Sequence, residues 1–176
     1  MSRNLLRNPC GEEDLEFWEL MENGGNGWTV EDMPGDCGHD FYNDEVKKYF
    51  ATSFEWCSKK QVINLLEEDY STEKLDTQPE VTVEDWYSSR TDCGCEYQLA
   101  VYLLNDNHEV IQEFKPELVV LDPEKDDCSW QQIKYTFSVY GPGMRFISFE
   151  HGGKDIKYWD GWFGVRVTGS SVTINL

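Results

Sequence analysis

Alternation of apolar and polar side chains predicts β-strands over most of the second half of the chain. The clearest strands are rich in β-branched and aromatic residues with a two-residue period, and they are Val81–Tyr87, Tyr97–Leu104, Glu109–Phe114, Ile133–Val139 and Met144–Phe149. A last strand is expected at either Val165–Val167 or Ser171–Ile174, with a Gly-containing break between the two alternatives. Helical periodicity is confined to Glu45–Tyr49 and Val62–Tyr70, and the second of these also fits a strand followed by a helical turn.

Segments rich in Gly, Asp and Asn separate these elements and predict loops at 22–27, 34–44, 88–96, 122–129 and 151–161, including a turn at Gly152–Asp155. Short strands at a spacing of about 8–12 residues favour a sandwich over alternating βα units. A chain of 176 residues is expected to form a single domain. We therefore predict one all-β sandwich domain covering residues 1–176.

The composition is that of a folded protein, and the charge excludes some classes of partner. Apolar residues make up 39% of the chain and aromatic residues 14%, which is too aromatic for a disordered segment. The formal net charge of −19 repels phosphate backbones and anionic membrane surfaces, so we expect no nucleic acid and no membrane insertion. No apolar run reaches the ~20 residues of a membrane span.

The six cysteines and three histidines do not predict a metal site. Met1–Cys10 has no apolar stretch typical of a secretory signal, so we expect a cytoplasmic protein with reduced thiols. The pairs Cys93-Gly-Cys95 and Cys37-Gly-His39 are spaced more tightly than structural zinc ligands usually are. We expect no metal and no cofactor.

The segment most suggestive of binding is Tyr158-Trp-Asp-Gly-Trp162, in a loop rich in Gly. An exposed indole offers a flat apolar surface and one donor, which suits stacking on the C–H face of a sugar ring. Asp155 and Asp160 would then accept hydrogen bonds from sugar hydroxyls. Alternatively, Trp159 and Trp162 cap one end of the sandwich core.

Catalysis is not indicated. No Gly-x-Ser-x-Gly elbow is present, and His39, His108 and His151 lie in segments that read as loops, or border one, without an evident nucleophile beside them. Paired carboxylates, as in glycosidases, do not indicate catalysis here, because a chain with 34 acidic residues contains many such pairs. We expect a binding protein and not an enzyme.

Several segments, taken together, resemble the F-box-associated domain of the sugar-recognising F-box proteins. The resemblance extends from about Arg3 to Ile174 and is carried by Arg3–Asp14, Gly24–Trp28, Val46–Phe50, Ser53–Cys57, Asp85–Tyr87, Asp92–Cys95, Tyr140–Gly143, Phe149–Gly153 and Tyr158–Trp159. It implies a ten-stranded antiparallel sandwich of jelly-roll type. It also implies recognition of the chitobiose core of high-mannose N-glycans on misfolded glycoproteins, through loops at one end of the sandwich.

The resemblance assigns carbohydrate-binding roles to six residues. Trp159 would stack on an N-acetylglucosamine ring with Tyr158 beside it, Phe54 would contact an acetamido methyl group, and Asp92 would accept hydrogen bonds from the core sugars. Cys37 stands where the sugar-binding members have Asn, and Asp160 stands where they have Lys. Cys37 replaces an amide by a weak thiol and Asp160 replaces a donor by an acceptor, so at about 1 kcal/mol or somewhat more for each lost bond they would weaken binding ~10–100-fold, unless Asp160 compensates by accepting from a hydroxyl.

These departures, and a segment at Ser71–Asp76 that is shorter by about one residue than in the family, leave an alternative open. The chain would then be a protein-interaction domain of the same fold that has lost glycan binding. The resemblance also implies a partner outside the chain: a Skp–cullin ubiquitin ligase, recruited only if an F-box accompanies this domain in the native protein. The 176 residues contain no F-box.

Overall fold

The structure is a computed structural model that describes residues 3–176. In this range it contains eleven strands, a 3-10 helix η1 (Leu65–Glu68) and one short helix α1 (Thr72–Asp76). The strands are β1 (Glu19–Asn23), β2 (Thr29–Asp32), β3 (Lys48–Ala51), β4 (Cys57–Asn64), β5 (Glu80–Ser88), β6 (Cys95–Leu104), β7 (Val110–Phe114), β8 (Val119–Leu121), β9 (Gln131–Phe137), β10 (Phe146–Asp155) and β11 (Arg166–Asn175).

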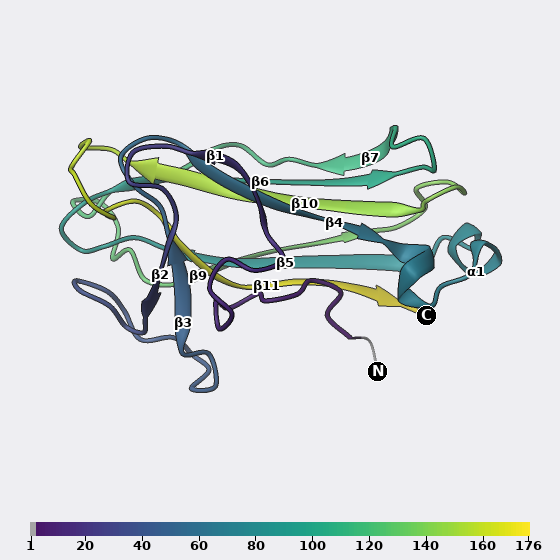
Figure 1. The fold of residues 1–176 in the computed structure, drawn as a ribbon, viewed down its shortest axis with the longest axis horizontal. Coiled ribbons are helices and arrows are strands. Elements are labelled where there is room, and N and C mark those ends of the chain that lie inside the picture. Colours follow the sequence, from purple (N-terminus) through teal and green to yellow (C-terminus); the bar gives the residue numbers. More distant parts are fainter. Residues whose placement is uncertain (1–2) are drawn as a thin grey trace.

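The strands form two antiparallel sheets that pack face to face (Figure 1). The first sheet has the order β1-β4-β10-β6-β7, with β8 also paired to β6, and the second has the order β2-β3-β11-β5-β9. In β6 the side chains of Tyr97, Leu99, Val101 and Leu103 are buried between the sheets, while alternate residues face outward. The predicted all-β antiparallel sandwich is therefore confirmed, with eleven strands in the described residues instead of the expected ten.

Most sequence-predicted strands are present, with corrections to length. β5, β6, β7 and β9 match their predictions to within two residues at each end. The two alternatives for the last strand are both correct, because β11 runs through both and the break between them is an irregularity between Thr168 and Ser171, where Gly169 has a φ of +66°.

The structure contradicts two other expectations and decides between the alternatives of a third. The helix predicted at Glu45–Tyr49 is wrong, because Lys48–Ala51 is β3, paired with β2 and β11. Val62–Tyr70 is the end of β4 followed by a helical turn, as the alternative prediction had it. The predicted turn at Gly152–Asp155 is also wrong, since these residues end β10.

The two glycines in β10 have a packing role. A Cβ at Gly152 would collide with the Cys57 carbonyl oxygen of β4, and one at Gly153 would collide with the Glu96 carbonyl oxygen of β6. Their absence of side chains lets neighbouring strands approach β10 closely.

A chain of polar side chains crosses the interior. Lys59 Nζ lies 2.8 Å from His151 Nε2, and His151 Nδ1 lies 2.7 Å from Asp85, which also accepts from the hydroxyls of Tyr97 and Ser170. The Lys59 amine also lies 3.1 Å from the ring centroid of Trp18. Burial lowers the pKa of Lys59 well below its usual value, against the opposing influence of Asp85.

Among residues 3–176, no helix combines the length and apolar character needed to cross a membrane.

Candidate functional site

The loop between β10 and β11 is held in shape by a buried carboxylate. Asp155 is fully buried at the end of β10, and its side-chain oxygens accept hydrogen bonds from the backbone amides of Lys157, Tyr158 and Trp159 at 3.0, 2.6 and 3.2 Å. Its own amide donates to the Ser53 carbonyl. Asp155 was expected to bind sugar hydroxyls. This expectation is wrong, because the carboxylate is buried and used by the loop backbone.

Two polar side chains join this loop to two others. The Ser53 hydroxyl donates to the Gly161 carbonyl at 2.5 Å and accepts from the Asn26 amide at 2.9 Å. The Asn26 carboxamide oxygen in turn accepts from the Gly161 amide at 2.7 Å. The loops at 24–27, 52–56 and 156–165 therefore form one connected end of the sandwich. We call this end the tip; it lies opposite α1 (Figure 1).

Trp159 lies at the tip with its ring partly open to solvent. The side chain is 38% exposed, and its ring packs perpendicular to the Phe163 ring at a centroid distance of 5.2 Å and an interplanar angle of 89°. Lys157 Nζ lies 4.7 Å from the Trp159 ring centroid. Tyr158 is 59% exposed, and its hydroxyl accepts a hydrogen bond from Lys154 Nζ at 2.7 Å. An indole packed against a neighbouring ring keeps its orientation while the exposed part of its surface remains available.

Asp92 is connected to Trp159 through two residues that sequence reasoning did not identify. Arg90 Nε and Nη2 donate to the two Asp92 carboxylate oxygens, each at 2.7 Å. The Arg90 guanidinium also lies 4.3 Å from the centroid of the Phe163 ring. Trp159 therefore contacts Phe163, Phe163 contacts Arg90, and Arg90 is hydrogen-bonded to Asp92. The Arg90 hydrogen bonds are the main reason that the pKa of Asp92 lies below its ordinary value.

Cys37 lies beside the same carboxylate. Its thiol forms a hydrogen bond that also lowers the pKa of Asp92, and its carbonyl accepts from the Thr91 amide at 2.9 Å. Cys37 is exposed and has a φ of 51°, a conformation in which Asn is strongly favoured over most other residues. The position is therefore geometrically suited to the Asn that the resemblance implies.

Phe54 lies in the 52–56 loop of the tip, near the 24–27 loop. It is half-buried and follows Ser53 directly, and a Cβ added at Gly25 would lie 3.0 Å from its ring. Asp160 is exposed in the loop between Trp159 and Gly161. Three of the six predicted residues belong to one series of contacts: Trp159, Asp92 and Cys37. Phe54, Tyr158 and Asp160 lie in the loops that Ser53 and Asn26 join.

Trp162 has a structural role. Its indole N–H donates to the Gly27 carbonyl at 2.8 Å, which ties the last loop to the first. The proposal that Trp162 caps one end of the sandwich therefore fits this contact better than ligand stacking does.

The cysteine pairs form no cross-link. All six cysteines are free, and Cys93 and Cys95 are both buried. Across residues 3–176, no three side chains of His, Cys, Asp or Glu are grouped as metal ligands would be.

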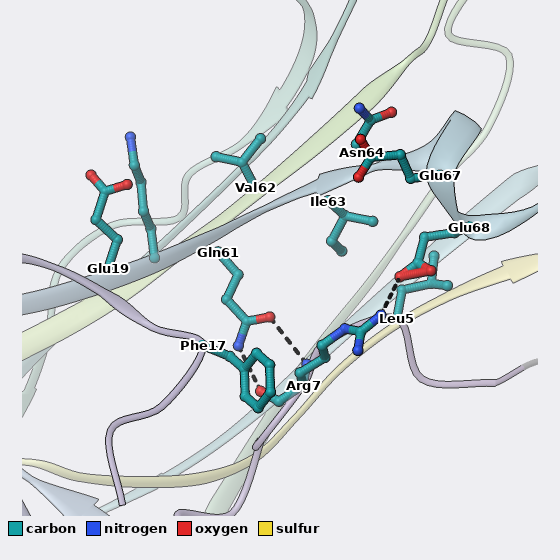
Figure 2. A pocket seen from close by; sticks show the side chains of 11 residues that line it. Leu5, Arg7, Phe17, Glu19, Gln61, Val62, Ile63, Asn64, Glu67 and Glu68 are labelled. Carbon is teal, nitrogen blue, oxygen red and sulfur yellow. Dashed lines mark hydrogen bonds and ion pairs between the residues drawn. The ribbon is translucent and has the colours of Figure 1, made fainter. Parts of the chain in front are cut away.

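A pocket of about 430 Å³ lies elsewhere, between the N-terminal segment and β4 (Figure 2). Three of its polar side chains form contacts within the protein. The Gln61 carboxamide accepts from the Arg7 amide and donates to the Arg7 carbonyl, and Glu68 forms ion pairs with Arg3 and Arg7 at 3.5 and 3.6 Å. These contacts attach the N-terminal segment to the sandwich, which is a structural role.

The family model described as "F-box associated region" matches residues 1–174. The chain belongs to the F-box associated (FBA) family. F-box only protein 2 of Bos taurus is 59% identical over 174 residues, which are 98% of this FBA chain and 59% of the relative. F-box only protein 44 of Mus musculus is 50% identical over 175 residues, with 99% and 68% covered. The FBA chain thus spans little more than half the length of F-box only protein 2.

Solved structures of low sequence identity share the fold. TmCBM61, in complex with β-1,4-galactotriose, has a TM-score of 0.57 at 14% identity and covers 97% of this FBA chain and 98% of its own. The enzymatically active domain of bacteriophage CBA120 tailspike protein 4 has a TM-score of 0.63 at 11% identity, covering 97% and 21%. At these identities the likeness establishes the sandwich architecture alone.

Proposed function

We propose that this FBA domain is a non-catalytic carbohydrate-binding module of the cytosol that recognises the chitobiose core of high-mannose N-glycans at the tip. The observation that carries the proposal is the half-open Trp159 ring, supported by Phe163 and linked through Arg90 to Asp92. The ring provides a stacking surface, and the carboxylate provides hydrogen-bond acceptors at a fixed distance from it. A neutral oligosaccharide also avoids the repulsion that a net charge of −19 imposes on anionic ligands.

Binding by stacking and a few hydrogen bonds needs no metal ion. The Arg90–Asp92 pair supports this mode, because it holds the carboxylate in place before a ligand arrives and reduces the ordering cost of binding. The relatives are named F-box only proteins and are longer than this chain. In a full-length protein with an F-box, the domain would present bound glycoproteins to a Skp–cullin ubiquitin ligase.

The test is titration of the purified domain with chitobiose, monitored by Trp fluorescence and by amide NMR spectra. Binding is expected at millimolar or lower concentration, with the largest shifts at the tip and their loss in Trp159→Ala. Trp86→Phe is the control, because Trp86 is an indole of β5 outside the loops of the tip, where it packs on Phe41 and Tyr42. No response of the native domain, or an unchanged response in Trp159→Ala, would refute the proposal.

A second candidate is a protein-interaction domain of the same fold that has lost glycan binding. It is favoured by Cys37 and Asp160, which replace an amide and an amine of the sugar-binding pattern. Equal capture of a glycoprotein before and after enzymatic deglycosylation would support it. So would chitobiose binding that appears only in the double variant Cys37→Asn, Asp160→Lys.

A further inference from the structure

The outer face of the first sheet contains a trough whose floor consists of small side chains. Outward-facing residues alternate with buried ones along β4, β10 and β6. Strand register places Ser58, Gly152 and Gln98 side by side across these three strands, and Ser148 lies between Val62 and Tyr102. The row between consists of Lys60, Glu150 and Ala100, so the depression lies over Ser58, Gly152 and Ala100 and is bordered by Glu150.

The walls of this trough carry aromatic and polar groups. The trough has a volume of about 280 Å³ and is lined by Trp56, Tyr102, Gln98, Lys115 and Glu150 above the small residues. Both aromatic side chains are half-buried, so each is fixed by its surroundings and keeps part of its surface open. Rings combined with an amide, a carboxylate and an amine form the set of groups that binds neutral polyhydroxylated ligands.

One end of the trough lies near the tip. Cys57 pairs with Gly153, so Trp56, just before β4, and Lys154, in β10, are the next residues toward the tip and lie at about the same level. Lys154 in turn donates to the Tyr158 hydroxyl at the tip. The trough therefore has Tyr102 among its lining residues and Trp56 at its end nearer the tip, with Tyr158 bonded to Lys154 beyond it.

Chemistry favours a saccharide over a peptide in this trough. β4, β10 and β6 are interior strands here, since β10 lies between the other two and these are paired on their far sides as well. An extended peptide placed on this face would find no unpaired strand edge with which to form main-chain hydrogen bonds.

We propose that the trough is a second carbohydrate subsite, which binds the outer mannose residues of an oligosaccharide whose core is held at the tip. This inference rests on the proposed function of the tip and extends it from a disaccharide to a longer glycan. Tyr102 and Trp56 stack on sugar rings, while Gln98, Glu150 and Lys115 form hydrogen bonds with hydroxyl groups.

The first experiment compares chitobiose with a high-mannose glycan that contains the same core, by calorimetric titration of the native domain and of Tyr102→Ala. The native domain is expected to bind the longer glycan more tightly. Loss of one stacking ring is expected to weaken that binding by about three- to tenfold and to leave chitobiose affinity unchanged. Tyr42→Ala is the control, because Tyr42 is an exposed aromatic residue that packs on Trp86 of the second sheet.

An equal ratio of the two affinities in the native domain and in Tyr102→Ala would overturn the trough proposal. Ala100→Leu provides a second test, because it fills the floor without removing a ring and is expected to have the same selective effect. Thermal unfolding of each variant confirms that the sandwich is intact.

The second experiment separates failure of the trough from failure of the tip. A mannose oligosaccharide without the chitobiose core is titrated while amide NMR shifts are followed. Shifts at Ala100, Tyr102 and Gly152 support the trough, even if chitobiose itself does not bind and the tip proposal fails. Shifts confined to residues 156–162, or no shifts at all, would overturn the trough proposal.

Discussion

The Arg90 guanidinium donates two hydrogen bonds of 2.7 Å each to the carboxylate of Asp92, two residues further along the chain. This geometry holds a carboxylate in place beside an aromatic ring, because the same guanidinium lies over Phe163. Paired hydrogen bonds of this kind fix direction as well as distance. The position of Asp92 is therefore determined before any ligand is present.

Replacement of Arg90 by Met is expected to raise the pKa of Asp92 toward its ordinary value of 3.8, because the guanidinium is the main cause of the lowered pKa. NMR titration of the side-chain carboxyl carbon measures this pKa directly. Arg145→Met is a matched control, since Arg145 lowers the pKa of Asp76 at a different part of the molecule. An unchanged Asp92 pKa in Arg90→Met would contradict the ion-pair assignment.

Asp155→Ala is expected to lower the free energy of unfolding by about 2–4 kcal/mol, because three backbone amides lose their acceptor. Asp155→Asn keeps one acceptor oxygen and should cost less. Chemical denaturation gives the energies, and hydrogen exchange of the Tyr158 and Trp159 amides reports the loop itself. Asp160→Ala, at an exposed acid of the same loop, should leave stability unchanged; comparable losses in both variants would argue against the anchoring role.

Stability is expected to fall as pH decreases below about 6.5, with a contribution from His151. Burial lowers the pKa of His151 from its ordinary value of 6.5 against the opposing attraction of Asp85, with Lys59 also lowering it. The unfolded chain then binds a proton that the folded chain does not, so acid favours unfolding. Stability is retained above the ordinary pKa and is lost as pH falls toward and through the folded one.

His151→Gln tests this contribution, because Gln can donate to Asp85 and accept from Lys59 without titrating. Urea unfolding between pH 5 and 8 is expected to show a shallower pH dependence in the variant than in the native domain. Identical slopes would assign the acid sensitivity to other groups.

Alkylation with iodoacetamide is expected to modify Cys37 first, because it is exposed, and to spare Cys57, Cys93, Cys95 and Cys128 until the domain unfolds. Burial raises the pKa of Cys93 to about 11, so little reactive thiolate forms there near neutral pH. Mass spectrometry of peptides from native and denatured protein measures each rate. Rapid modification of Cys95 in the native domain would show that this interior opens readily.

Strands could be predicted from the sequence where alternate residues are buried. Val81–Tyr87 and Tyr97–Leu104 show this pattern because both strands lie inside their sheets. β1 was missed, since all five of its residues are exposed at a sheet edge and its two apolar residues, Leu20 and Met21, are adjacent and do not alternate with polar ones. Gly152 and Gly153 were read as a turn, because close approach between strands and tight turning favour the same residue type.

At the tip, sequence reasoning identified the residues that face solvent better than those that support them. Trp159 and Asp92 were identified, whereas Phe163 and Arg90, which connect them, were not. Their roles depend on contacts between loops that are far apart in the sequence. Asp155 was assigned the wrong role for the same reason, as only the folded strand reveals that its carboxylate points inward.

The buried carboxylate at the end of β10 has a consequence for engineering. It binds main-chain amides, and these are present whatever side chains follow it, except proline. Tyr158 has a φ of 56°, which most side chains adopt only with strain, so libraries randomised at 159 and 160 should retain the same backbone path while presenting new surfaces. Such a domain could be given new binding surfaces without redesign of its framework.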